Sequence, residues 1–322
     1  DTWALNEGVI SDAAFLKQTY DIDREREDML FAALDKVRKG AVVCVLGATH
    51  RNQHMVWGYL EEGHPAARGA PTNGDGRPGG EHADAIEDLY RHNDAMVGRI
   101  RDRLGEGDCL MVISDHGFTS FRRGVNLNAW LHENGYLHLQ EGARGEGEWL
   151  REVDWSRTRA YALGLTGLYL NLEGREAEGS VKPGEEAIAL KAELVERLSG
   201  LRDPENGDLA IREAFDTTAL YQGPYLRQAP DLLMGYAEGY RISWDGATGV
   251  VAGPVFEDNV KAWSGDHCVD PRTVPGVFFS DTRIDREDPA LIDIAPTALW
   301  LFGLEPPAHI DGQNLFDPES RP

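Results

Sequence analysis

The chain has 322 residues, of which 41% are hydrophobic, which is enough for one large domain or two ordinary ones with a substantial core. Its formal net charge of −23 repels nucleic acid and anionic membranes, so we expect no nucleic-acid duplex as a partner. No apolar run reaches the length of a membrane span, so we expect no membrane-spanning segment.

The cysteines and the first residue bear on where the protein resides. Cys44, Cys109 and Cys268 are odd in number and lie in strand-like or site-like contexts. They predict no disulfide framework and favour a reducing compartment such as the cytoplasm. The chain opens on Asp1 rather than on Met, so we expect that its natural N-terminal part is missing from this sequence.

Helix and strand patterns alternate over the first third of the chain. Apolar residues recur at helical spacing over 25–39 and 85–104, which predicts two amphipathic helices. Each is followed by a short apolar run, "AVVCVLG" (41–47) and "CLMVIS" (109–114), typical of strands covered on both faces. This alternation predicts an α/β fold with a largely parallel sheet flanked by helices. Between the strands, the Gly- and Pro-rich segment 66–84 predicts a long loop.

The pattern changes over 142–240. The segment "TRAYALGLTGLYLNL" (158–172) predicts a pair of strands around a glycine turn, and 184–198 has the periodicity of an amphipathic helix. The segment "PDLLMGYAEGYRISW" (230–244) predicts two more strands. Together these elements predict an α+β insertion or cap.

The α/β core is expected to occupy 1–141 and to resume over 241–322. In its second part, "VPGVFFS" (274–280) predicts another core strand. The segment "DIAPTALWLFGL" (293–304) predicts a helix, with an acidic residue and a proline near its start and a glycine near its end.

Candidate metal ligands lie beside three of the predicted strands. Asp115 and His116 directly follow 109–114, the place where ligands bind in an open α/β sheet. His50 and His54 follow 41–47 at a spacing that puts both on one face of a helix.

The third segment is "KAWSGDHCVDP", which carries Asp266 and His267 shortly before 274–280. Imidazole and carboxylate side chains together suit zinc, and also manganese or iron. Taken singly, an Asp-His pair is also typical of a turn, and His-x-x-x-His also occurs by chance on surface helices. From the pattern alone a metal site and these structural interpretations both stay open.

Three motifs resemble a known family. "SDHGF", "GDHCVDPRTVPGVFFS" and "DIAPTALWLFGLEPPAHIDGQNL" are similar to the type I phosphodiesterase/nucleotide pyrophosphatase family of the alkaline phosphatase superfamily, and the resemblance extends over nearly the whole chain. It implies an alkaline-phosphatase-like fold. It also implies hydrolysis of small-molecule phosphate esters or phosphodiesters with two divalent metal ions, usually zinc.

The resemblance also implies which side chains hold the ions. Asp115 and His116 match the pair beside the nucleophile, while His54 and His267 match ligands of the other metal. His50 stands where the family has an aspartate. That change would give a site of three imidazoles with one negative charge fewer, or it would empty the site and mark a degraded enzyme.

Other expected roles also come from the resemblance. The family nucleophile, a Thr or Ser at a helix start, has no match here, so we expect this chain to be the C-terminal portion of a catalytic domain that an N-terminal segment or chain completes. Arg122 could contact a phosphate oxygen and Trp57 could stack on the substrate, although surface solvation and core packing are the structural alternatives. The competing functions are a non-catalytic member that binds a phosphate-bearing ligand or partner, and a phosphomutase or sulfatase of the same superfamily.

Overall fold

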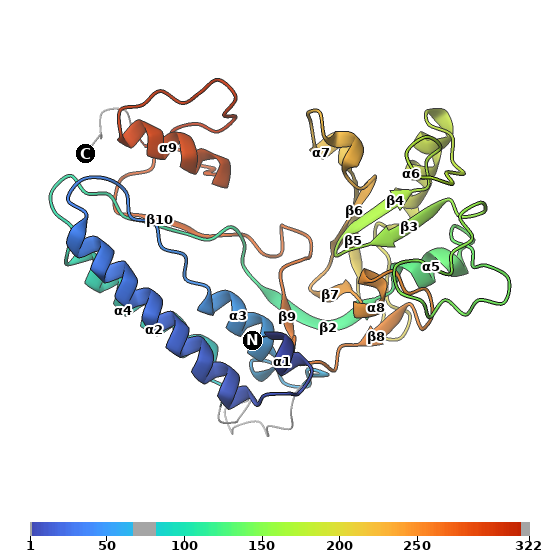
Figure 1. Ribbon diagram of the computed structural model, residues 1–322, viewed down its shortest axis with the longest axis horizontal. Helices are drawn as coiled ribbons and strands as arrows, with labels where there is room; N and C mark the ends of the chain where they lie inside the picture. Colours follow the sequence, from blue (N-terminus) through green and yellow to red (C-terminus); the bar gives the residue numbers. More distant parts are fainter. Residues whose placement is uncertain (1, 67–81, 317–322) are drawn as a thin grey trace. The chain divides into compact units, whose positions relative to one another are not determined.

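The computed structural model describes residues 2–66 and 82–316 (Figure 1). The chain divides into two compact units, and each is made of three separate stretches of the sequence. Unit 1 consists of Asp1–Thr19, His50–Ile86 and Phe118–Val274, and unit 2 of Tyr20–Thr49, Glu87–Gly117 and Pro275–Pro322. Most of the predicted loop over 66–84 lies outside the described residues.

The described residues of unit 1 form two sheets. In the first, β2 (Thr119–Val125) runs parallel to β7 (Gly239–Ile242) and antiparallel to β8 (Phe256–Asp258) and β9 (Gly265–Asp266). Its strands come from segments far apart in the sequence, which meet around β2 (Figure 1). The first sheet therefore brings the segment after Phe118 beside the segment that carries His267.

The second sheet of unit 1 has four antiparallel strands in the order β3-β4-β6-β5. Their bounds are Ala160–Leu163 for β3, Gly167–Leu170 for β4, Leu232–Tyr236 for β6 and Ile211–Asp216 for β5. The structure thus confirms the strand pair predicted over 158–172 and the two strands predicted over 230–244. One pair among the described strands, β2 with β7, is parallel, so the chain is mixed α/β and a largely parallel sheet stays a prediction.

The main hydrophobic core lies on this second sheet. Helix α6 (Glu185–Leu198) covers it with Ala187, Leu190, Leu194 and Leu198, which recur every three or four residues and are buried. This is the stripe expected of an amphipathic helix, and it confirms the helix predicted over 184–198. Helix α5 (Leu127–Glu133) begins at Asn126, whose side chain accepts hydrogen bonds from the two backbone N–H groups of Asn128 and Ala129.

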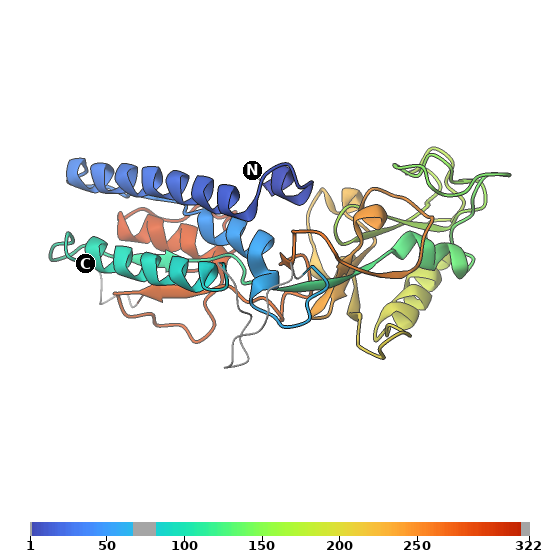
Figure 2. The same cartoon turned by 90° about the horizontal axis from the view of Figure 1, so that it is seen from below.

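Unit 2 is built mainly from helices. It holds most of α2 (Asp12–Lys36) and of α4 (Ala85–Arg101), which Figure 2 shows running alongside each other. Glu27 of α2 joins them, because its carboxylate contacts His92 and Arg99 of α4. Unit 2 also contains η3 (Leu291–Asp293), α9 (Ile294–Leu301) and an antiparallel pair, β1 (Met111–Ile113) with β10 (Phe278–Ser280).

The prediction of a buried strand over 41–47 is wrong. These residues form no strand, and the side chains of Val43 and Val45 are 87% and 71% exposed. A β-branched run becomes a buried strand only when another strand pairs with its backbone and a further layer covers its side chains. Among the described residues, this run has instead a hydrogen bond from the Arg26 guanidinium to the Val45 carbonyl.

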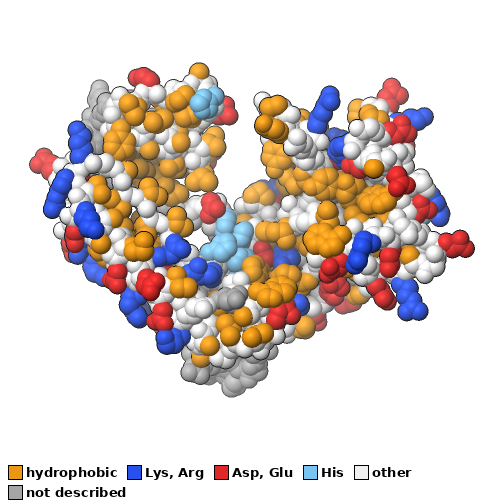
Figure 3. All heavy atoms as spheres, viewed as in Figure 1, with side chains coloured by type: hydrophobic (Ala, Val, Ile, Leu, Met, Phe, Trp, Pro, Cys, Tyr) orange, Lys and Arg blue, Asp and Glu red, His pale blue; other side chains and the backbone are white. Residues whose placement is uncertain are grey.

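Apolar side chains also reach the surface elsewhere in unit 2. Figure 3 shows hydrophobic side chains gathered over α9 and β10; Phe279 and Ile292 are more than half exposed, and Phe302 is 50% exposed. The strand predicted over 109–114 is present as the short β1, with side chains that are half-buried or exposed. Burial on both faces, which the apolar composition of this run predicts, is therefore not observed in the described residues.

The remaining described elements are short. They are α1 (Thr2–Asn6), α3 (Ala48–Val56), η1 (Trp57–Tyr59), α7 (Thr217–Leu220), η2 (Leu226–Gln228) and α8 (Trp244–Ala247). Within 2–66 and 82–316, no helix combines the length and the apolar composition that crossing a membrane requires.

Candidate metal centre

Helix α3 positions the first two candidate ligands. His50 and His54 lie one helical turn apart, and their Nε2 atoms are 3.2 Å from each other. The centroids of the two rings are 4.6 Å apart. His54 is buried and His50 is exposed, so the pair extends from the interior of unit 1 to its surface.

The third imidazole comes from the residue after β9. The ring of His267 lies 5.1 Å from that of His50 and 5.2 Å from that of His54, measured between centroids. β9 is held against the start of β2 by pairing of Gly265 with Ser120 and of Asp266 with Thr119. Three of the predicted ligands therefore converge within unit 1.

Phe118 packs against all three imidazoles. Its ring centroid lies 4.8 Å from that of His54, 5.2 Å from that of His267 and 5.4 Å from that of His50, each in an edge-to-face arrangement. This residue belongs to the "SDHGF" motif and immediately precedes β2. No role was predicted for Phe118 from the sequence, although its place close to Asp115 and His116 was a usable signal.

The tautomer of His54 follows from its hydrogen bonds. Its Nδ1 lies 2.8 Å from the Gly265 carbonyl oxygen, which can only accept, so Nδ1 carries the hydrogen. The lone pair of the ring is therefore on Nε2, the atom that faces His50. Burial is the main cause that lowers the pKa of His54, to about 3, so the ring is neutral at neutral pH. A neutral imidazole with one nitrogen fixed by a backbone carbonyl is the usual form of a metal-binding histidine.

The geometry of the pair fits a divalent metal ion. Two imidazole nitrogens at 2.0–2.1 Å from a tetrahedral zinc ion lie about 3.3 Å from each other. The His50 and His54 Nε2 atoms are 3.2 Å apart without any rearrangement. With His267 beside them, the three side chains match in number and type the protein ligands of some catalytic zinc sites.

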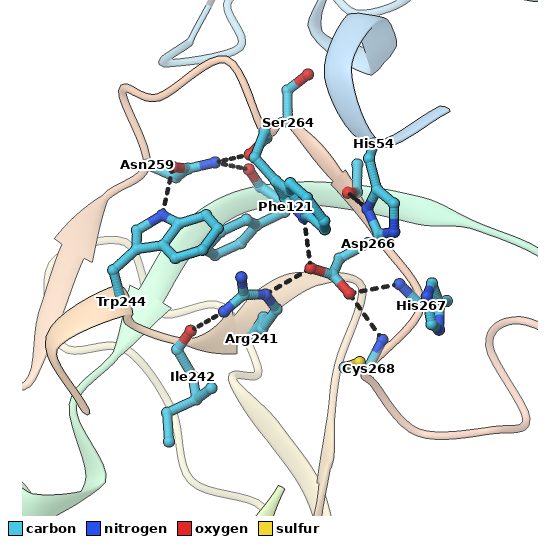
Figure 4. Close-up of polar contacts among 12 residues, drawn as sticks. His54, Phe121, Arg241, Ile242, Trp244, Asn259, Ser264, Asp266, His267 and Cys268 are labelled. Carbon is cyan, nitrogen blue, oxygen red and sulfur yellow. Dashed lines mark hydrogen bonds and ion pairs between the residues drawn. The ribbon is translucent and has the colours of Figure 1, made fainter. Parts of the chain in front are cut away.

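Asp266 lies next to His267 in the sequence but is not placed as a ligand. It is buried, and both of its carboxylate oxygens accept hydrogen bonds (Figure 4). The Oδ1 atom accepts from the backbone N–H groups of His267 and Cys268, and Oδ2 accepts from Arg241 Nε and Trp263 Nε1. Burial alone would raise the pKa of Asp266, but the Arg241 guanidinium and the other donors hold this pKa well below its usual range.

A second group of possible metal ligands shares His267 with the three imidazoles. One ligand atom from each of Asp266, His267 and Cys268 lies within 4.8 Å of the others. The Asp266 carboxylate is already saturated with donors. Burial, together with the charge of Asp266, raises the pKa of the Cys268 thiol to about 12, whereas metals bind the thiolate. The three imidazoles are therefore the better donor set.

The two predicted substrate-binding residues meet at Glu61. Trp57 Nε1 donates to Glu61 Oε1 at 2.8 Å, and the Trp57 ring stacks on Phe118 with centroids 6.3 Å apart. Arg122 Nη1 donates to Glu61 Oε2 at 3.1 Å and its Nη2 to the Gly63 carbonyl at 2.7 Å. The Arg122 side chain stays 38% exposed. Contact with a substrate stays a prediction for both residues.

Asp115 and His116 belong to unit 2, at the end of β1. The Nε2 atom of His116 lies 3.7 Å from Asp115 Oδ1, and its Nδ1 lies 2.8 Å from the Gly117 carbonyl oxygen. The contact with Gly117 is a hydrogen bond that resembles that of His54, because it leaves Nε2 as the nitrogen able to bind a metal. Their assignment to the metal beside the nucleophile stays a prediction.

Besides Phe118, Arg241 and Trp263 are side chains at this site for which the sequence predicted no role. Arg241 is a cation in the middle of an otherwise apolar strand, β7, and is almost completely buried. A buried arginine requires an anionic partner, so this position was a signal in itself. The sequence does not reveal that the partner is Asp266, because 25 residues separate the two along the chain.

A comparison with models of protein families gives a match over most of the chain. The model of the family described as type I phosphodiesterase / nucleotide pyrophosphatase matches residues 21–249. This range includes His50, His54, Asp115 and His116 and ends before His267. No curated protein matches the chain significantly.

Proposed function

This chain belongs to the type I phosphodiesterase / nucleotide pyrophosphatase family, and we propose that it works as a metal-dependent phosphodiesterase or nucleotide pyrophosphatase. Members of this family hydrolyse small phosphate esters and are generally metal-dependent. We assign one divalent cation, most simply zinc, to His50, His54 and His267. The observation that carries this assignment is the 3.2 Å approach of the His50 and His54 Nε2 atoms, with the His267 ring beside them.

Two of the three imidazoles have distinct tasks in this proposal. His54 is the fixed ligand, because burial keeps it neutral and the Gly265 carbonyl orients its Nε2. His50 is exposed and therefore bounds the site on the side from which a substrate arrives. When bound, a divalent ion supplies Lewis-acid stabilisation of negative charge on the phosphate oxygens.

His50 is a ligand in this proposal rather than a sign of lost function. Its Nε2 atom lies beside that of His54, at the separation expected for two nitrogens on one zinc ion. Imidazole is a neutral ligand, so the full positive charge of the ion would remain to attract a phosphate. An aspartate in place of His50 would cancel part of that charge.

The rest of the machinery is proposed from the family resemblance. We assign Asp115 and His116 to a second divalent ion, and we take the nucleophile to be a Thr or Ser outside this sequence. Arg122 would contact a phosphate oxygen and Trp57 the organic group of the substrate. The exposed part of the Arg122 side chain supports the first of these roles.

The test combines metal binding with turnover. The protein is expressed from its complete gene, stripped with a chelator and titrated with zinc, and hydrolysis of an aryl phosphodiester is measured. We expect His54→Ala and His267→Ala to lose zinc binding and hydrolysis, whereas His138→Ala, a change outside the cluster, leaves both unchanged. A protein that is folded, binds no zinc and gives no turnover would disprove the proposal.

A further inference from the structure

We propose that the buried ion pair between Arg241 and Asp266 positions His54 and His267 for metal binding. This inference rests on the proposed function, since it concerns the same metal site. Neither residue is a metal ligand in this proposal. Arg241 and Asp266 are positioning residues, which act by fixing the backbone of the segment from Trp263 to Cys268.

The Arg241 guanidinium is held by two hydrogen bonds and by two aromatic rings. Its Nε donates to Asp266 Oδ2 at 2.5 Å, and its Nη1 donates to the Ile242 carbonyl at 2.7 Å. The rings of Phe121 and Trp244 lie 4.4 Å and 4.5 Å from its central carbon, so both contribute cation–π contacts. The side chains of Arg241 and Asp266 are 2% and 3% exposed. The guanidinium therefore has little freedom to move and holds Asp266 in place.

Asp266 in turn fixes the segment from Trp263 to Cys268 through its hydrogen bonds. Its Oδ1 accepts from the backbone N–H groups of His267 and Cys268 at 2.7 Å and 2.9 Å, which fixes the backbone from which the His267 side chain leaves. Its Oδ2 accepts from Trp263 Nε1 at 2.8 Å, and the Trp263 ring lies over His54 with centroids 3.9 Å apart. One carboxylate thus connects to both imidazoles.

The backbone on the other side of Asp266 reaches His54 directly. Gly265 immediately precedes Asp266, and its carbonyl accepts the hydrogen bond from His54 Nδ1 at 2.8 Å. This bond sets the tautomer that leaves Nε2 available for a metal. If the ion pair were lost, we expect Gly265 to shift and the tautomer of His54 to lose its definition.

Stability alone does not explain why a charged pair is buried here. Apolar side chains of similar volume often replace a buried ion pair without loss of stability. Such a replacement could not provide the four hydrogen-bond acceptor contacts that Asp266 makes. The pair is also neutral as a whole, so it orders the segment from Trp263 to Cys268 without adding net charge beside the three imidazoles. These properties fit a positioning role better than a purely structural one.

The test compares Arg241 with an arginine that forms a similar pair elsewhere in unit 1. Arg123 of β2 donates to Asp203, which is fully buried, at 2.5 Å, and it contacts none of the three imidazoles in the contacts described. The variants are Arg241→Met, Arg241→Lys and the control Arg123→Met. Two readouts are used: zinc affinity from competition with a chromophoric chelator, and the ¹⁵N shifts of His54 in the zinc-free protein, which report its tautomer.

We expect Arg241→Met to weaken zinc binding by about 10- to 100-fold, the usual effect of losing a group that orients a ligand. His54 should change from a single Nδ1–H tautomer to a mixture. Arg241→Lys keeps the positive charge but cannot make both hydrogen bonds of the guanidinium, so we expect intermediate effects on both readouts. This variant decides the test if Arg241→Met does not fold. Arg123→Met should lower the melting temperature without changing either readout.

Two results would overturn the inference. One is unchanged zinc affinity and an unchanged His54 tautomer in a folded Arg241→Met or Arg241→Lys variant. The other is an equal loss in Arg123→Met, which would assign the effect to general loosening of unit 1. If the wild-type protein binds no zinc at these histidines, the proposed function fails, and the tautomer comparison still decides whether Arg241 positions His54.

Discussion

Gly265 is the residue at which β9 comes into close contact with α3 and η1. A Cβ atom at this position would lie 2.3 Å from the backbone oxygen of Gln53 and 2.9 Å from the Cβ atom of Trp57. A backbone oxygen cannot rotate away as a flexible side chain does. Gly265→Ala must therefore push the two segments apart by about 1 Å to restore van der Waals contact.

The expected cost has two parts. Overpacking of this kind costs about 1–3 kcal/mol, and losing a hydrogen bond costs about 1 kcal/mol more. The bond at risk joins His54 Nδ1 to the Gly265 carbonyl at 2.8 Å, and a displacement of about 1 Å along it would take it beyond hydrogen-bonding range. We expect the free energy of unfolding of unit 1 to fall by about 2–4 kcal/mol, and zinc binding to weaken by at least about 10-fold.

The assay is urea unfolding followed by tryptophan fluorescence, together with a zinc titration of the same samples. Gly98→Ala is the matched control, because a Cβ atom there meets nothing within 4 Å and the residue lies inside helix α4. This control should gain up to about 1 kcal/mol from the higher helix propensity of alanine. If Gly265→Ala keeps both wild-type stability and wild-type zinc affinity, the close approach of β9 to α3 is not what orients His54.

Further substitutions test the ligand set and the core. His50→Asp should weaken zinc binding by at least about 10-fold and reduce hydrolysis, because the shorter side chain cannot reach the position of the His50 Nε2 atom beside His54. A gain in hydrolysis would show instead that His50 replaced a functional aspartate. Leu194→Ala, in the fully buried stripe of α6, should cost about 2–5 kcal/mol in urea unfolding, whereas Ile188→Ala on the exposed face of the same helix should change stability by no more than about 0.5 kcal/mol. Equal effects at the two α6 positions would contradict the packing described.

The parts of this structure that the sequence predicts are those that depend on local spacing. His50 and His54 lie within one helical turn, so their juxtaposition required only that α3 form. The apolar stripe of α6 and the strand pair around the glycine turn are also encoded by short segments of sequence. In each case, the residues that determine the geometry are close neighbours along the chain.

The parts that the sequence does not predict depend on distant partners. The run 41–47 has the composition of a buried strand, but burial requires neighbouring elements, and the exposed Val43 and Val45 side chains have none over them among the described residues. Asp266 looks like a ligand because it adjoins His267. In the structure, however, the Asp266 carboxylate accepts a hydrogen bond from Arg241. These two residues come together because β2 pairs with both β7 and β9.

The local charge of the site resolves an apparent conflict between the acidity of the protein and its proposed substrates. A formal net charge of −23 should repel a phosphate ester at long range. At physiological ionic strength, however, exposed charges are largely screened beyond about 8 Å, so the groups nearest the substrate decide the interaction. In unit 1 the three candidate ligands are imidazoles, and Arg241 balances the charge of the buried Asp266. A divalent ion held there would keep its full charge, so an acidic protein can still attract an anionic substrate to this one place.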